Sequence, residues 1–238
     1  MARPFAAFDI DGTLVRWQLF HATADALVKA GKIDGKQYQA IKDARMSWKK
    51  RMHQESFKEY EARLVVTYEE VLTQLSVQDV QAAMDTVFEE YKDQVYIYTR
   101  DLIKELKAKN YLLFAVSGTQ TELVAKLAQY YGFDDWVGSS YEHQENSFTG
   151  KADLALGRKH EVLQDLIEKH GASMKGSIAV GDSAGDASML EMVEQPIAFN
   201  PEGKLLTIAK RKKWKIIVER KNVIYQLEPS GDSYRLTG

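Results

Sequence analysis

The chain of 238 residues is predicted to fold as an α/β protein, with a parallel β-sheet core that carries helices on both faces. From about residue 100 onwards, short apolar runs alternate with segments of helical periodicity, which is typical of such a core. The residues before that point are different. No proline occurs between Phe5 and Gln195, and no glycine occurs between Lys36 and Ser117. So long a stretch without breaking residues indicates a helical insert in the α/β core.

The core is expected to open with a strand at residues 5–10, FAAFDI, which is apolar up to its end. In the insert, apolar residues at spacings of three and four predict helices near 17–30, 36–52, 56–75 and 77–92. After the insert we predict helices at 100–109, 120–131, 158–170 and 186–193, and strands at 111–116, 177–181 and 196–200. We therefore assign residues 1–15 and 96–238 to the α/β core domain and residues 16–95 to a helical domain.

The last part of the chain predicts a short C-terminal β element. In WKIIVERKNVIYQLE, two β-branched runs flank Lys221-Asn222, a pattern typical of a hairpin or a pair of edge strands. The basic run at residues 210–213 beside Trp214 offers a site for an anionic partner. We interpret it instead as the solvated end of a helix that precedes the hairpin.

Composition excludes several classes of function. A net charge of −2 and a pI near 6.2 provide no global attraction to nucleic acid or to an anionic membrane. The absence of cysteine excludes disulfides, thiolate catalysis and sites with cysteine-bound metal. No apolar signal segment and no stretch of membrane-spanning length is present, so we expect a soluble cytoplasmic protein, monomeric or homodimeric.

Polar residues follow three of the predicted strands at the point where each strand ends. They are Asp9 and Asp11 after the first strand, Ser117-Gly118-Thr119 after LLFAV, and Asp182 with Asp186 after SIAVG. Ligands of open parallel sheets bind at the carboxyl ends of the strands. If these strands are neighbours, the carboxylates and the hydroxyl group meet at one edge of the sheet.

So much negative charge in a partly desolvated place implies a cation. Oxygen ligands without cysteine or clustered histidine select a hard ion, and Mg²⁺ is the prediction. A magnesium ion beside a serine–glycine turn suits a phosphate group, and phosphate in turn favours a fixed cation. Lys159, at the start of the helix that contains KHEVLQDL, is the best candidate for that cation.

These residues resemble the four ordered motifs of the haloacid dehalogenase (HAD) superfamily. The motifs are Asp9-x-Asp11-Gly12-Thr13, the serine of AVSGT, a lysine followed by HEVL, and Gly181-Asp182-x-x-x-Asp186. The insert between the first two motifs resembles the helical cap of the phosphoserine phosphatase-like branch, subfamily IB. The resemblance covers nearly the whole chain except for the last thirty residues. It implies a Rossmann-like core with an inserted cap domain, and a magnesium-dependent phosphatase that acts on a small phosphorylated metabolite.

The resemblance also implies catalytic roles. Asp9 would be the nucleophile that attacks phosphorus and forms an aspartyl-phosphate, which water then hydrolyses. Asp11 would protonate the leaving alcohol and later deprotonate the attacking water. Mg²⁺ would be held by the Asp9 side chain, the Asp11 backbone carbonyl and Asp182.

Further residues are implied to hold the phosphate or to support the site. Ser117, the N–H group of Gly118 and Lys159 would hold the phosphate oxygens. Asp186 would orient either Lys159 or a metal-bound water, and Thr13 would support the first motif.

The substrate is left open by the sequence. Residues close to the first motif in the cap, among them Arg16 and Gln18, are expected to help select it. Phosphoserine phosphatases have a glutamate near the position of Gln18 that meets the substrate ammonium, and a neutral amide binds an ammonium less well. Arg63 is a candidate for receiving a carboxylate or a second phosphate, as are Arg45 and Arg51.

Three alternative functions share the same residues. A phosphotransferase or mutase would pass the phosphoryl group from Asp9 to an alcohol instead of water. A carbon–halogen hydrolase needs the nucleophile but neither the metal nor an acid at Asp11, so Asp11 argues against it. A catalytically silent HAD-fold binding protein would tolerate losses in the motifs, and all four motifs are intact.

Overall fold

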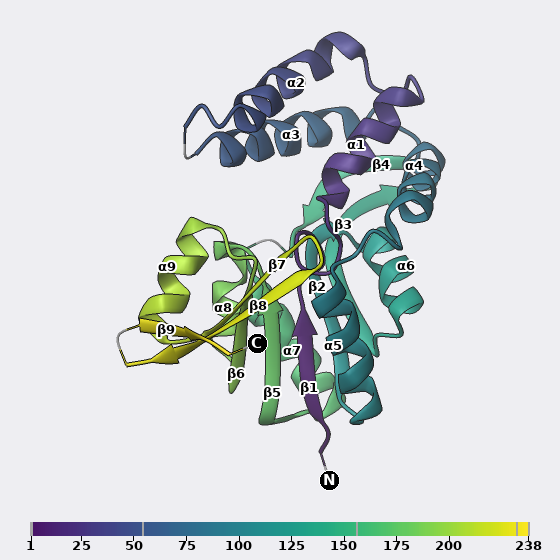
Figure 1. Cartoon of the computed structure of the whole chain (residues 1–238). Helices are drawn as coiled ribbons and strands as arrows, with labels where there is room; N and C mark the ends of the chain where they lie inside the picture. The colour runs from purple at the N-terminus through teal and green to yellow at the C-terminus, as the bar shows by residue number, and fades with distance from the viewer. Residues whose placement is uncertain (1, 54, 156, 232, 238) are drawn as a thin grey trace. The chain divides into compact units, whose positions relative to one another are not determined.

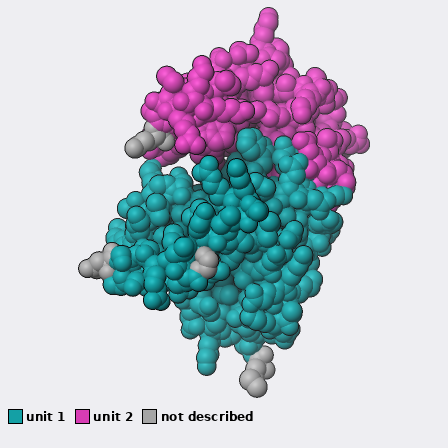
Figure 2. All heavy atoms as spheres, viewed as in Figure 1, with its two compact units in different colours: residues 1–18, 91–139, 154–238 teal, residues 19–90, 140–153 magenta. Residues whose placement is uncertain are grey.

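A computed structural model describes residues 2–53, 55–155, 157–231 and 233–237 (Figure 1). The chain divides into two compact units (Figure 2). The first, which we call the α/β unit, contains residues 1–18, 91–139 and 154–238. The second, which we call the helical unit, contains residues 19–90 and 140–153.

The α/β unit is built on a sheet whose strands follow the order β3-β2-β1-β5-β6-β7-β8-β9. The neighbouring pairs from β3–β2 to β6–β7 are parallel, whereas β7–β8 and β8–β9 are antiparallel. The strands are β1 (Pro4–Phe8), β2 (Leu112–Gln120), β3 (Asp135–Gln144), β5 (Ser173–Gly181), β6 (Gln195–Phe199), β7 (Lys215–Arg220), β8 (Val223–Ser230) and β9 (Ser233–Leu236). The predicted α/β class with a mainly parallel sheet is confirmed.

Helices cover both faces of this sheet, as predicted. They are α5 (Ile97–Ala108), α6 (Thr121–Tyr131), α7 (Lys159–His170), α8 (Ala187–Leu190) and α9 (Gly203–Lys212), with a 3₁₀ turn, η1, at Ala184–Asp186. Successive strand residues point to opposite faces. In β6, Ala198 packs in the core that contains Leu163 of α7 and Leu205 of α9. Its neighbour Phe199 stacks on Tyr98 of α5, with ring centroids 5.8 Å apart.

The helical unit contains α1 (Leu19–Lys29), α2 (Gly35–Lys49), α3 (Ser56–Leu72) and nearly all of α4 (Val77–Tyr91). Its interior is partly polar. The Arg45 guanidinium donates to both carboxylate oxygens of Asp25, at 2.8 and 2.9 Å, and to the hydroxyls of Tyr38 and Tyr60. Trp48 stacks on Tyr60 with 5.6 Å between ring centroids, so it packs inside this unit.

The helical unit also includes a β-hairpin that the sequence analysis did not predict. The end of β3 pairs antiparallel with β4 (Ser147–Asp153), and the hairpin adds residues 140–153 to this unit. Its strands carry few apolar residues, and the burial pattern of β4 is mostly exposed, so the alternation that marks a strand in sequence is weak. The assignment of residues 16–95 to a cap with a catalytic function stays a prediction.

The other end of the chain agrees with the interpretation of the basic run. α9 ends at Lys212, and Lys213 follows in the left-handed conformation with φ 57°, so the run is a helix end with its last turn exposed. The helix predicted at 186–193 is shorter, because η1 takes its first residue and α8 ends at Leu190. Within the described ranges, no helix combines the length and the apolar character required to cross a bilayer.

Candidate active site

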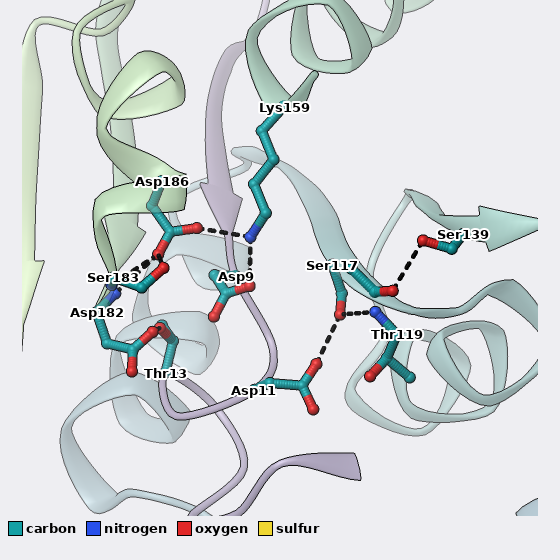
Figure 3. A network of polar contacts seen from close by, with 11 residues as sticks. Asp9, Asp11, Thr13, Ser117, Thr119, Ser139, Lys159, Asp182, Ser183 and Asp186 are labelled. Carbon is teal, nitrogen blue, oxygen red and sulfur yellow. Dashed lines mark hydrogen bonds and ion pairs between the residues drawn. The ribbon is translucent and has the colours of Figure 1, made fainter. Parts of the chain in front are cut away.

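Three neighbouring strands bring acidic and hydroxyl side chains to one edge of the sheet (Figure 3). β1 pairs in parallel with both β2 and β5, so the carboxyl ends of these strands lie side by side. Asp9 directly follows β1, Asp182 directly follows β5, and Ser117 lies within β2, which continues to Gln120 and so extends past the predicted end at residue 116. The three strands are therefore neighbours in the sheet, as the site required.

Lys159, the first residue of α7, forms the centre of a buried ion-pair cluster (Figure 3). Its ammonium lies 2.6 Å from Asp9 Oδ1 and 2.6 Å from Asp186 Oδ1. The three residues are at most 4% exposed. Lysine is almost never fully buried unless its ammonium is paired with a negative charge, and here two carboxylates pair with it.

Both oxygens of Asp186 are engaged. Oδ1 accepts from Lys159, and Oδ2 accepts from the backbone N–H groups of Asp182 and Ser183, at 3.1 and 2.9 Å, and from the Ser183 hydroxyl at 3.0 Å. Of the two contacts predicted for Asp186, the one with Lys159 is present. The carboxylate thereby ties the ammonium to the loop that carries Asp182.

A second set of hydrogen bonds connects the first two motifs. The Ser117 hydroxyl lies 2.7 Å from Asp11 Oδ2, and its oxygen accepts the backbone N–H of Thr119 at 2.9 Å. Ser117 has no exposed surface, whereas Asp11 is half-buried. Asp11 is therefore the more accessible member of this hydrogen-bonded pair.

The loop after β1 needs a glycine. Gly12 has φ 80°, and a Cβ atom placed on it would lie 2.3 Å from Asp182 Oδ2. The next residue, Thr13, is buried, and its hydroxyl lies 3.5 Å from Asp182 Oδ1. Thr99 of α5 donates its hydroxyl to the Thr13 carbonyl at 2.9 Å. The loop is thus held against both Asp182 and α5.

The electrostatics of the site reflect burial and crowding of like charge. Burial raises the pKa of Asp9 to about 7, although the Lys159 ammonium opposes this and Asp186 adds to it. Burial and the charge of Asp9 also raise the pKa of Asp182 well above its usual range. Burial by itself lowers the pKa of Lys159, but Asp186 and Asp9 outweigh it and raise that pKa above its usual value. The ammonium stays charged, whereas the ionised forms of Asp9 and Asp182 are disfavoured by burial and mutual repulsion, and a further cation would stabilise them.

The donor set fits a hard divalent cation. Asp9, Asp182 and Asp186 each offer a carboxylate oxygen, and these three atoms lie within 4.8 Å of one another. Oxygen-only ligands with excess negative charge are what Mg²⁺ takes in proteins. Since both oxygens of Asp186 already accept hydrogen bonds, Asp9 and Asp182 are the better placed pair of side-chain ligands.

The residues predicted to select the substrate are distributed over both units. In the α/β unit, Arg16 is exposed, with its guanidinium 5.6 Å from the centre of the Tyr96 ring, and Gln18 is half-buried. In the helical unit, Arg63 is exposed on α3, while the donors of Arg45 are used inside the unit as described above. Their role in substrate selection stays a prediction.

A family model for haloacid dehalogenase-like hydrolases matches residues 6–191, which include all four motifs. The chain belongs to the haloacid dehalogenase-like hydrolase family. This HAD-family chain is also similar to a phosphoserine phosphatase of Wolinella succinogenes, with 32% identity over 127 residues that cover 52% of the chain and 59% of that relative. It is 21% identical to a histidinol-phosphatase of Neisseria meningitidis, with 89% of the chain and 97% of that relative covered.

Among solved structures, the HAD chain resembles a phospho-aspartyl intermediate analogue of phosphoserine phosphatase with a TM-score of 0.62 and 21% identity. This match covers 93% of the chain and 95% of the solved one, and it supports the fold. The chain spans little more than half the length of the Wolinella relative. The activity is therefore argued below from the residues of the site.

Two residues that support the backbone around the site were not predicted from sequence. Ser139 of β3 donates its hydroxyl to the Gly118 carbonyl at 2.8 Å. Glu219 of β7 accepts the backbone N–H groups of Ile97 and Tyr98, at 3.0 and 2.8 Å, and so caps the first turn of α5. No local pattern marks either residue, since their partners lie 21 and more than 100 positions away in sequence.

Proposed function

We propose that the chain is a magnesium-dependent phosphomonoester hydrolase that acts on a small phosphorylated metabolite through an aspartyl-phosphate on Asp9. The observation that carries this proposal is the position of Asp9. Its carboxylate lies 2.6 Å from the Lys159 ammonium at the same edge of the sheet as the pair formed by Asp11 and Ser117. A nucleophile, a fixed cation and a proton-transferring carboxyl are the three groups that in-line phosphoryl transfer requires.

In the first step, the Asp9 carboxylate attacks phosphorus and the bond to the leaving alcohol breaks. Asp11 donates the proton that the leaving alkoxide needs. In the second step, Asp11 accepts a proton from the water that attacks the aspartyl-phosphate, which returns Asp9 and releases inorganic phosphate.

The phosphate oxygens are proposed to be held by Lys159, the Ser117 hydroxyl and the Gly118 N–H group. Mg²⁺ would be held by the Asp9 side chain, the Asp11 backbone carbonyl and Asp182, and when bound it neutralises the charge of the carboxylates and the phosphate. Asp186 keeps Lys159 in place while Asp9 changes its charge during the reaction. We propose that the helical unit, with Arg63, contributes to substrate selection together with Arg16 and Gln18.

The test is a screen for release of inorganic phosphate from phosphorylated amino acids, amino alcohols, sugars, glycerol phosphates and nucleotides, with and without Mg²⁺. We expect Mg²⁺-dependent release that Asp9→Asn abolishes. Asp101→Asn is the matched control, since Asp101 is an exposed aspartate of α5 whose ion pair with Arg100 contributes little. Equal rates for wild type and Asp9→Asn would remove Asp9 from the mechanism.

The phosphotransferase alternative shares every residue of the first step, so it needs a separate measurement. An alcohol acceptor added to the assay captures the phosphoryl group if transfer competes with hydrolysis. Release of inorganic phosphate without a phosphorylated acceptor supports the hydrolase. A folded protein that releases no phosphate from any compound in the screen would favour the silent binding protein.

A further inference from the structure

A continuous chain of hydrogen bonds runs from β3 to Asp11 (Figure 3). The Ala155 N–H donates to Ser139 Oγ at 3.3 Å, and Ser139 Oγ donates to the Gly118 carbonyl at 2.8 Å. The Thr119 N–H then donates to Ser117 Oγ, which lies 2.7 Å from Asp11 Oδ2. We propose that Ser139 is a positioning residue that fixes the Gly118–Thr119 peptide and thereby aims the Ser117 hydroxyl at Asp11.

The first step of the argument is the direction of each proton. A carbonyl oxygen only accepts and a backbone N–H only donates. Ser139 Oγ already accepts from Ala155, so its own proton goes to the Gly118 carbonyl. Ser117 Oγ likewise accepts from Thr119, and while Asp11 is ionised the Ser117 proton goes to Asp11. While Asp11 is ionised, the hydroxyls of Ser139 and Ser117 therefore each have one orientation in this series of hydrogen bonds.

The second step is the rigidity of the peptide group. The carbonyl of Gly118 and the N–H of Thr119 belong to one planar trans peptide and point in opposite directions. When Ser139 holds the carbonyl on one side, the N–H is turned toward Ser117 on the other side. The effect of Ser139 thus reaches Ser117 without any direct contact between the two side chains.

The third step is the reason why this peptide needs a side-chain partner. In the β2–β3 ladder, Val116 pairs with Val137 and Gln120 pairs with Ser139, so three residues of β2 lie opposite a single residue of β3. A register shift of this kind interrupts the regular backbone hydrogen bonds. Ser139 replaces the missing ladder contact with its hydroxyl.

Burial makes this contact strong. Ser117, Thr119 and Ser139 are at most 3% exposed, so water does not compete for the hydrogen bonds. β3 also approaches this loop closely. A Cβ atom added to Gly138 would lie only 2.5 Å from the Thr119 carbonyl oxygen. There is little space for the loop to find another conformation while Ser139 is intact.

The inference rests on the proposed function, because Ser139 acts on Ser117, whose hydroxyl is proposed there to hold the phosphate. The experiment compares Ser139→Ala with Ser139→Thr, which keeps the hydroxyl, and with Ser177→Ala as the matched control. Ser177 is a fully buried serine of β5 whose hydroxyl accepts the Glu194 N–H at 3.0 Å, outside the site. Loss of either serine hydroxyl is expected to destabilise the protein to a similar degree.

Two measurements are made on each variant. The first is amide hydrogen exchange of Thr119 in the free protein, which does not depend on catalysis. The second is the inhibition constant of inorganic phosphate together with KM and kcat for a phosphomonoester. For Ser139→Ala we expect Thr119 exchange at least tenfold faster, and an inhibition constant and KM about tenfold higher with a smaller change in kcat. Ser139→Thr and Ser177→Ala should stay within about threefold of wild type.

A double-mutant cycle tests the route of the effect. If Ser139 acts through Ser117, the variant Ser117→Ala/Ser139→Ala binds phosphate no more weakly than Ser117→Ala alone. Additive losses, unchanged Thr119 exchange in Ser139→Ala, or an equal effect of Ser177→Ala would each overturn the inference. If Ser139→Ala does not fold, Ser139→Cys keeps the shape with a weak donor and should show the same direction of change.

Failure of the proposed function is distinguishable from failure of this inference. A wild-type protein that releases no phosphate fails the proposed function, and the exchange measurement then still tests whether Ser139 fixes the loop. Active enzyme with normal Thr119 exchange in Ser139→Ala fails the inference alone.

Discussion

His21 provides a quantitative test of the packing inside the helical unit. It is 1% exposed, its ring lies edge-on to Tyr60 with centroids 4.6 Å apart, and among the described residues its Nδ1 has no hydrogen-bond partner. Burial lowers the pKa of His21 to about 3, and the Arg45 charge contributes to the shift while Asp25 opposes it. The folded protein therefore holds this histidine in its neutral form.

The sign of the pH effect follows from these values. Between about pH 3 and 6.5 the unfolded state binds a proton at His21 and the folded state does not, so stability falls as the pH is lowered. With a pKa of 6.5 for His21 in the unfolded chain, the free energy of unfolding falls by about 2 kcal/mol between pH 7 and pH 5, since each pKa unit corresponds to about 1.4 kcal/mol. The stabilising contribution is fully present above pH 6.5.

The measurement is urea denaturation of wild type and His21→Phe at pH 7 and pH 5, at constant Mg²⁺ concentration, followed by far-UV circular dichroism. The phenylalanine has a similar shape and does not titrate, so its steric effect is the same at both pH values. On acidification from pH 7 to pH 5, the free energy of unfolding should fall by about 2 kcal/mol more for wild type than for His21→Phe. A difference below about 0.5 kcal/mol, or His21 ring NMR signals that titrate near pH 6, would refute the reasoning.

Two further predictions concern the backbone that carries the site. Gly12→Ala places a methyl group 2.3 Å from Asp182 Oδ2 at a residue with φ 80°. We therefore expect the free energy of unfolding to fall by about 2 kcal/mol and the Mg²⁺ affinity to be at least tenfold lower. Thermal unfolding and calorimetric Mg²⁺ titration check this, and unchanged affinity would contradict it. Glu219→Ala removes the carboxylate that caps α5 at Ile97 and Tyr98. It should lower the free energy of unfolding, measured by urea denaturation, by about 1–2 kcal/mol. Glu219→Gln, which keeps an acceptor, should recover part of the loss, and equal stability of Glu219→Ala and wild type would exclude the capping role.

Much of the fold could be predicted because its signals are local. Helical periodicity placed α1 to α4 and α7 within a few residues of their observed ends. Apolar runs that end in polar residues identified β1, β2 and β5, and with them the carboxylates that meet at the edge of the sheet. The β3–β4 hairpin was missed because its mostly polar, exposed strands lack a regular apolar alternation.

The sequence by itself determined which chemical groups the HAD site contains, because Asp9, Asp11, Ser117 and Asp182 stand at the ends of the predicted strands, which short-range patterns identify. Only the tertiary structure decided how those groups are held. The Lys159 contact with Asp9 spans 150 positions, and the hydroxyl of Ser139 reaches a peptide of another strand. Such contacts depend on strand register and on distances in space, which no local pattern in the sequence encodes.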